Sequence, residues 1–148
     1  MPFTSGLRIE VRRAGPADGG RCARIFLDAR RKAFPWQPVE RFGLDDYYDC
    51  VEDELVIVAE VGGTVVGFVS IDLPERFIHT LFIDPLWQQR GIGTLLLREA
   101  LAELRGSAQL SCSARNAAAR AFYEHNGWVP VPGANDDGAA HVLYRKAE

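Results

Sequence analysis

Residues 77–104 read FIHTLFIDPLWQQRGIGTLLLREALAEL, and this stretch decides how the rest of the chain is organised. Its first seven residues are apolar at both odd and even positions. Phe77, Leu81 and Ile83 share one predicted face, and Ile78 and Phe82 share the other. A strand that is apolar on both faces is typical of the middle of a sheet covered on both sides. The sequence therefore predicts a central strand that ends at Asp84-Pro85.

A helix is predicted after this strand, and its start has the features of an anion site. Apolar residues recur with a spacing near 3.6 over 92–104, and Gly106 supplies a stop. Gly91 and Gly93 stand at the entry to this helix. The first N–H groups of a helix have no partner inside it, and the helix dipole adds partial positive charge. We therefore expect this loop to bind an anion, most often phosphate, with Arg90 adding a formal charge.

Two common phosphate-binding motifs do not fit this loop. A P-loop requires Gly-Lys-Ser/Thr, whereas Gly93 is followed by Thr94 and Leu95. A dinucleotide fingerprint requires a third glycine at position 96, which is leucine, and an acidic residue about 20 positions later. The sequence around Ser111 has no such acidic residue. Another class of phosphate ligand is therefore indicated.

Composition indicates one soluble globular domain over residues 1–148. The chain is 47% apolar and 25% charged, and its length is enough for a substantial core. Its net charge of −3 argues against non-specific nucleic-acid binding. No apolar run reaches transmembrane length, and no signal-peptide pattern opens the chain. The three cysteines have no CxxC spacing, so we expect reduced thiols in a cytoplasmic protein and no metal site.

The other predicted elements follow from hydrophobic spacing and turn residues. Before the central strand we expect a strand at 7–11, helices at 22–33 and 44–51, and strands at 55–60 and 64–71. Gly62-Gly63 forms the turn between these last two strands, and Gly67 marks a bulge. After 92–104 we expect a strand at 109–112, parallel to the central strand, and a helix at 117–125. The last strands, 128–131 and 141–144, form an antiparallel pair joined by loop 132–140.

Two motifs carry a resemblance to a known family. LFIDP followed by Gln-x-x-Gly-x-Gly resembles the pyrophosphate loop of the GNAT acetyltransferase superfamily. The segment NAAARAFYEHNGW, at 116–128, is similar to its later motif, Asn-x₆-Tyr-Glu-x-x-Gly-aromatic. The predicted order β-α-α-β-β-β-α-β-α-β-β matches this superfamily over nearly the whole chain. The resemblance implies an α/β (α+β) fold with a mixed sheet of about seven strands and about four helices.

The resemblance also implies an N-acetyltransferase that uses acetyl-CoA. The backbone of Leu81, Phe82 and Ile83 is then expected to pair with the pantetheine amides, and one of these N–H groups to polarise the thioester carbonyl. The pyrophosphate would lie on Gln88, Gln89, Arg90, Gly91, Ile92, Gly93 and Thr94. Asn116 either contacts the pantetheine or only caps its helix, and the two roles are compatible.

Acetyl transfer to an amine requires groups that move protons. A lysine-like ammonium has a pKa of about 10.4, so a base must remove a proton before attack. His79 is the first candidate, because imidazole titrates near neutral pH and the residue is placed two positions before Leu81, on the same predicted face. Glu75 or a chain of waters is the alternative. Tyr123 is the candidate acid for the departing thiolate. Both side chains also have an ordinary structural interpretation as packed core residues.

The acceptor is less well specified than the donor. Trp36, Tyr47 and Tyr48 are candidate contacts for an ammonium group through cation–π interactions, although tyrosines in this position are also common in cores. We expect a small-molecule primary amine that attacks directly in a ternary complex. The alternatives are a protein N-terminus or lysine as acceptor, and a non-catalytic sensor that binds acyl-CoA. The folding of segment 34–48 decides between a closed pocket and an open groove, and a homodimer is compatible with the resemblance.

Overall fold

The computed structural model describes residues 8–132 and 140–146. Its elements are β1 (Ile9–Arg13), α1 (Gly19–Ala33), α2 (Asp46–Cys50), β2 (Leu55–Val61), β3 (Thr64–Asp72), β4 (Phe77–Ile83), α3 (Ile92–Glu103), β5 (Ala108–Ser113), α4 (Ala117–His125), β6 (Val129–Pro130) and β7 (His141–Lys146). This order confirms the predicted one. Position 7 of the first predicted strand and positions 133–139 of the predicted loop lie outside the described residues.

The second helix is shorter than the sequence predicts. The Asp46 carboxylate accepts hydrogen bonds from the Gly43 amide at 2.9 Å and from Arg30 at 3.2 Å, so residues 43–45 form a turn that leads into α2 at Asp46. At the other end, Asp53 has a left-handed backbone with φ of 64°. Helical backbone therefore covers only Asp46–Cys50 of the predicted span 44–51.

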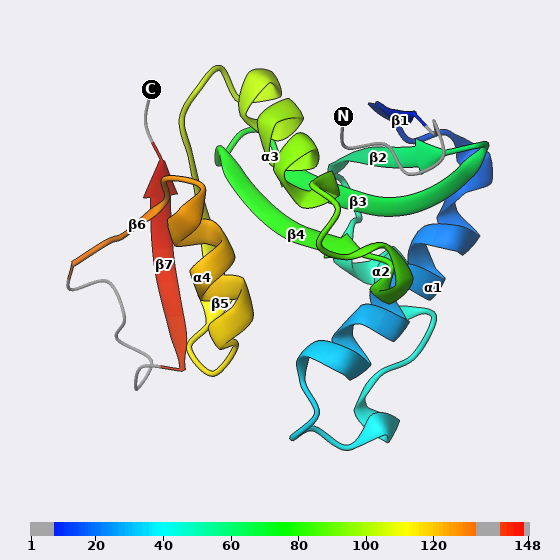
Figure 1. The fold of residues 1–148 in the computed structure, drawn as a ribbon, viewed down its shortest axis with the longest axis horizontal. Coiled ribbons are helices and arrows are strands. Elements are labelled where there is room, and N and C mark those ends of the chain that lie inside the picture. The colour runs from blue at the N-terminus through cyan, green and yellow to red at the C-terminus, as the bar shows by residue number, and fades with distance from the viewer. Residues whose placement is uncertain (1–7, 133–139, 147–148) are drawn as a thin grey trace.

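The seven strands form one mixed sheet in the order β1-β2-β3-β4-β5-β7-β6. Every neighbouring pair is antiparallel except β4 and β5, which are parallel as predicted. These two strands pair only at Phe77 with Gln109 and at Ile78 with Leu110. Beyond these pairs they diverge, and the sheet opens into the V that is visible in Figure 1. Among the strands within residues 8–132 and 140–146, none pairs with this edge of β4 from His79 onward.

The sheet is covered on both faces, as the apolar pattern of β4 predicts. One core cluster packs α3 against β2, β3 and β4 and extends to Trp128 and Tyr144 beside α4. The other packs α1 and α2 against the opposite face of β2 and β3, with Phe26, Tyr47 and Phe68 at its centre. The two clusters place β4 in the interior of a layered α/β structure.

Two bulges alter the simple alternation of side chains. In β3 the pairing passes from Gly67 to Val65, so Val66 is the extra residue, next to the glycine that predicted a bulge. In β4 the pairing passes from Thr80 to Ile78, so His79 is the extra residue. The predicted faces of β4 are therefore wrong at Ile78 and at His79. The bulge brings Ile78 into the same core cluster as Leu81 and Ile83, and it turns His79 to the opposite side of the sheet.

The described helices give no indication of a membrane span. Among those in residues 8–132 and 140–146, none is both long enough and apolar enough to cross a bilayer.

Candidate active site

The loop between β4 and α3 is anchored by Asp84. Its carboxylate accepts a hydrogen bond from the Leu86 amide at 2.9 Å and forms an ion pair with Arg21 of α1. Arg21 also donates to the Val65 carbonyl of β3 at 2.8 Å. Asp84 is nearly fully buried, so this link joins α1, β3 and the start of the loop in one rigid unit.

Residues 88–91 of this loop take an unusual backbone path. Gln88 ties the loop to the protein, because its amide donates to the Ile83 carbonyl at 3.2 Å and its side-chain oxygen accepts from Lys32 at 2.9 Å. Gln89 and Gly91 both have left-handed backbones, with φ of 64° and 83°. Such a conformation suits glycine, and at Gly91 it turns the chain directly into α3. Arg90 is exposed and stacks over the Trp87 ring at 4.9 Å.

The first turn of α3 has the arrangement expected of an anion site. The first hydrogen bond into the turn runs from the Leu95 amide to the Gly91 carbonyl at 3.2 Å. The amides of Ile92, Gly93 and Thr94 precede it and, by helix geometry, have no acceptor within the helix. Gly93 also allows α4 to approach, because a Cβ there would lie 3.0 Å from Cζ of Phe122. The glycine therefore serves packing as well as access to the backbone.

Leu81, Phe82 and Ile83 lie on the part of β4 that has no β5 partner. Their backbones pair with Val69, Phe68 and Gly67 of β3, so only the other edge is open. The side chains of Leu81 and Ile83 pack into the α3 core, and that of Phe82 packs toward α1. This edge offers backbone N–H and C=O groups to an extended ligand.

His79 lies on the α2 side of the sheet, away from the core that contains Leu81. The imidazole Nδ1 is 2.9 Å from Oε2 of Glu54, and the sulfur of Cys50 lies 4.0 Å from Nδ1 and 3.9 Å from Nε2. The prediction that His79 shares the face of Leu81 is therefore wrong, because the bulge at His79 reverses the alternation. The imidazole is 42% exposed, and the Glu54 side chain is only 11% exposed.

The surroundings of His79 make its imidazole more basic. Hydrogen bonding to the Cys50 sulfur and the nearby Glu54 carboxylate raise the pKa of His79 to about 9, against the lowering effect of burial. The imidazole is therefore mostly protonated at neutral pH and accepts a proton readily only in alkaline solution. In the part of the chain that the structure describes, no group of three or more His, Cys, Asp or Glu side chains is arranged to hold a metal ion.

Tyr123 lies on α4 against the α3 core cluster. Its ring packs beside Phe122, Trp128 and Tyr144, with ring centroids 5.4 to 6.3 Å apart. Burial, with a smaller contribution from Cys112, raises the pKa of Tyr123 well above its ordinary value. Its phenol therefore stays protonated across the physiological range. Asn116 caps α4 through its side-chain oxygen, which accepts from the Ala119 amide at 3.1 Å.

The three aromatic residues proposed for the acceptor have different surroundings. Tyr47 is 4% exposed and packs edge-on against Phe68, a position that favours its interpretation as a core residue. Tyr48 is about half exposed and lies beside Gly19 at the start of α1. Trp36 is half-buried, and the Arg115 guanidinium lies 4.4 Å from its ring. The contact between Trp36 and Arg115 joins the α1–α2 loop to the β5–α4 loop.

Two residues of this region were not identified from the sequence. Glu54 follows α2 in a run of acidic residues that resembles an ordinary solvated turn, and its partner is 25 positions away. Arg115 directly precedes Asn116, which drew attention for its role as a cap. Neither residue has a local signal, because each contact depends on which strands and loops the sheet brings together.

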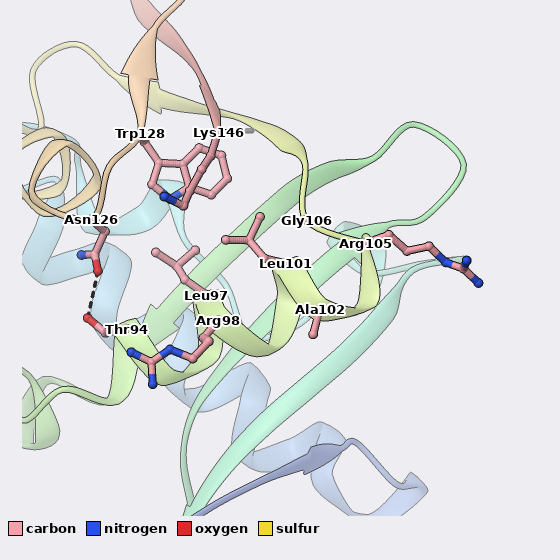
Figure 2. A pocket seen from close by; sticks show the side chains of 10 residues that line it. All are labelled: Thr94, Leu97, Arg98, Leu101, Ala102, Arg105, Gly106, Asn126, Trp128 and Lys146. Carbon is pink, nitrogen blue, oxygen red and sulfur yellow. Dashed lines mark hydrogen bonds between the residues drawn. The ribbon is translucent and has the colours of Figure 1, made fainter. Parts of the chain in front are cut away.

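A hollow of about 590 Å³ lies beside α3 (Figure 2). Leu97, Leu101 and Trp128 form its apolar lining, and the indole nitrogen of Trp128 has no hydrogen-bond partner within the described residues. At the end near the start of α3, the Thr94 hydroxyl donates to the Asn126 side chain at 3.3 Å. Arg98 lies at this same end, whereas Arg105 points away from the hollow in Figure 2. The hollow therefore continues from the open first turn of α3.

Comparisons with known proteins agree with this geometry. The family model described as the acetyltransferase (GNAT) family matches residues 21–128. N-alpha-acetyltransferase RimI of Mycobacterium tuberculosis is 33% identical over 126 residues, which cover 78% of this chain and 75% of that protein. The [ribosomal protein bS18]-alanine N-acetyltransferase of Salmonella typhimurium is 32% identical over 108 residues, or 69% of this chain and 70% of the relative.

A solved structure supports the fold. The PaiA N-acetyltransferase from Thermoplasma acidophilum, in complex with coenzyme A, superposes with a TM-score of 0.81. It is 18% identical in sequence, and the match covers 95% of this chain and 99% of that one. At this identity the similarity shows the fold alone.

Proposed function

The chain belongs to the GNAT acetyltransferase family and is an N-acetyltransferase. From this premise, we propose that it transfers the acetyl group of acetyl-CoA to a small primary amine, by direct attack in a ternary complex. One observation carries the proposal. An open strand edge, residues 79–83 of β4, leads into a helix start whose first amides have no partner. A strand-like amide chain that ends in a diphosphate matches both features.

The donor binds along this path. The amides of residues 91–94 and the side chain of Arg90 hold the pyrophosphate, and Gln88 keeps the loop in shape through its two hydrogen bonds. The pantetheine amides pair with the open edge of Leu81, Phe82 and Ile83. One N–H of this edge polarises the thioester carbonyl. The solved relative from Thermoplasma acidophilum, which contains coenzyme A, supports a ligand of this class.

The adenosine end of the donor extends toward the hollow beside α3. This hollow begins at Thr94, next to the proposed pyrophosphate site, and Arg98 lies one helical turn further along α3. An apolar lining with an arginine at its edge fits a nucleoside that carries a further phosphate.

The reaction needs one proton acceptor and one proton donor. His79 is the first residue of β4 beyond the last pair with β5, so its side chain is close to the point where the strands separate. We assign it the role of base, and its raised pKa predicts that activity increases with pH up to about 9. Tyr123 protonates the CoA sulfur as it departs, which agrees with a phenol that stays protonated.

The contact between Trp36 and Arg115 favours a small acceptor. It connects the two halves of the molecule on either side of the V, and so narrows the approach that a peptide would need. A protein N-terminus is the second candidate, because two relatives are named for protein acetylation. The three free cysteines suit a reducing compartment, and we propose the cytoplasm.

A thiol-release assay with acetyl-CoA tests the proposal. The panel contains small primary amines, peptides with free N-termini and peptides with internal lysine. Turnover with small amines, and rate plots that intersect when both substrates are varied, would support direct attack on a small acceptor. Turnover with N-terminal peptides alone would replace the acceptor class. Acetyl-CoA binding by calorimetry without turnover on any amine would favour a non-catalytic sensor.

A further inference from the structure

Glu54 is a mostly buried carboxylate beside the proposed base. Its Oε2 is 2.9 Å from Nδ1 of His79, and its side chain is 11% exposed. Its other oxygen, Oε1, has no hydrogen-bond partner within residues 8–132 and 140–146. Burying a carboxylate oxygen in this state costs stability. An arrangement that costs stability and aims a charge at one imidazole points to a role in the reaction.

The backbone holds Glu54 in place on rigid elements. Its amide donates to the Val51 carbonyl at 2.9 Å, which closes the turn after α2, and the left-handed Asp53 lies within that turn. β2 begins at the next residue, Leu55, which pairs with Ile71 of β3. Ile71 in turn pairs with Ile78 of β4. The ion pair therefore joins the start of β2 to β4 across β3, which lies between them.

The position of His79 is equally defined. As the extra residue of a bulge, it has no partner in β3, and the last pair between β4 and β5 is the residue before it. Bulges commonly re-aim a side chain beside an active site. The titratable side chains that act on the imidazole are Cys50, at the end of α2, and Glu54. The neighbouring hydroxyls of Ser70 and Thr80 are neutral and bond each other at 2.5 Å.

We propose that Glu54 is a positioning residue for acetyl transfer, which holds the proton of His79 on Nδ1 so that Nε2 receives the proton of the acceptor amine. The inference rests on the proposed function, in which His79 is the base. As the amine nitrogen bonds to the acetyl carbon, its proton passes to Nε2 and the carbon–sulfur bond breaks. The CoA sulfur takes a proton from Tyr123. The Glu54 carboxylate keeps its charge throughout and stabilises the imidazolium that forms.

The carboxylate also accounts for part of the basicity of the imidazole. With a pKa of about 9, roughly one His79 in 100 is neutral at pH 7. Removal of the negative charge would leave more neutral imidazole at pH 7 but a weaker and less well oriented base. A structural role alone would change stability without changing the pH at which the reaction becomes fast.

Glu54→Gln tests the proposal, with Glu52→Gln as the matched control in the same turn. Glu52 is exposed, so its loss should leave both the pH profile and the histidine titration unchanged. In Glu54→Gln we expect the acid limb of kcat/KM to move down by about one pH unit or more, and the plateau to fall about tenfold or more. The acetyl-CoA Kd should stay within about twofold, because the donor contacts lie elsewhere.

Nitrogen NMR of the His79 ring supplies a readout that does not depend on activity. In the parent protein we expect the neutral ring to carry its proton on Nδ1, and in Glu54→Gln this preference should weaken and the titration midpoint should fall. Glu54→Asp, which keeps the charge but draws it back by one methylene, should give an intermediate midpoint. Glu54→Asp also provides the test if Glu54→Gln does not fold.

The possible outcomes separate the inference from the function on which it rests. If a folded Glu54 variant keeps both the parent midpoint and the parent pH profile, the positioning role is overturned while the acetyltransferase stands. If His79→Ala retains full turnover, the assignment of the base fails, and the role of Glu54 fails with it. A lowered midpoint together with a shifted acid limb supports the proposal.

Discussion

Replacing Gly93 by alanine adds one methyl group where α3 meets α4. The new Cβ would lie 3.0 Å from Cζ of Phe122 and 3.4 Å from Cε1. Unstrained contacts between carbons lie at about 3.5–4.0 Å, so the ring must retreat by roughly half an ångström. Phe122 packs against the α3 core cluster and cannot retreat freely. The substitution therefore tests how tightly α3 packs against α4 at Gly93.

The magnitude is a balance of two terms. Overpacking a contact of this kind costs roughly 1–3 kcal/mol, whereas alanine is favoured over glycine in a helix by up to about 1 kcal/mol. We expect a net loss of about 1 kcal/mol in the free energy of unfolding, and a Tm lower by roughly 2–4 °C. Gly20→Ala in α1 is the control, because no atom lies within 4 Å of its new Cβ. It should stabilise by about 0.4–1 kcal/mol.

Urea unfolding and thermal melts of both variants provide the measurement. A double variant with Phe122→Leu should recover part of the loss, with a coupling energy of about 1 kcal/mol. Acetyl-CoA affinity should change little, since alanine keeps the amide that faces the proposed pyrophosphate site. If Gly93→Ala stabilises the protein as much as Gly20→Ala does, the packing argument is refuted.

Three further predictions concern the site itself. Tyr123→Phe should lower kcat by about 100-fold or more and leave the acetyl-CoA Kd within about twofold, because it removes only the proton donor; unchanged turnover in the thiol-release assay would exclude the acid role. Gly91→Ala meets no neighbouring atom but must hold φ near 83°, which costs roughly 1–2 kcal/mol. Calorimetry should therefore show acetyl-CoA binding weakened by a factor of about 5–30, and less for Gly91→Asn, because asparagine tolerates this backbone better; equal affinity for glycine and alanine would contradict the loop geometry. Finally, the folded pKa of His79 is raised to about 9, so its contribution to stability is complete below its ordinary pKa of 6.5 and is lost as the pH rises through 9. Because the imidazole is 42% exposed, we expect the loss to be on the order of 1 kcal/mol. Urea unfolding at pH 6.5 and pH 9.5 measures it as the difference in free energy of unfolding between the parent and His79→Gln. If this difference does not become smaller at pH 9.5, the pair adds no stability.

The strand, loop and helix that form the proposed donor site could be predicted from the sequence alone. The apolar run of β4, the glycines at 91 and 93 and the amphipathic pattern of α3 are local signals, and each depends on residues within one or two turns of one another. Helix propensity, capping by Asn116 and the stop at Gly127 are local in the same sense, and α4 has the predicted bounds. Physical rules of short range therefore specified the elements and their order.

The contacts of the proposed acceptor site depended on the tertiary structure. The bulge that turns His79 toward Cys50 and Glu54 arises from the register between β3 and β4, and a strict two-residue period cannot show an extra residue. The pair of His79 with Glu54 and the contact of Trp36 with Arg115 join segments separated by 25 and 79 positions. Such contacts form only when the whole sheet is assembled. The residues around each partner do not show which distant segment will lie beside it.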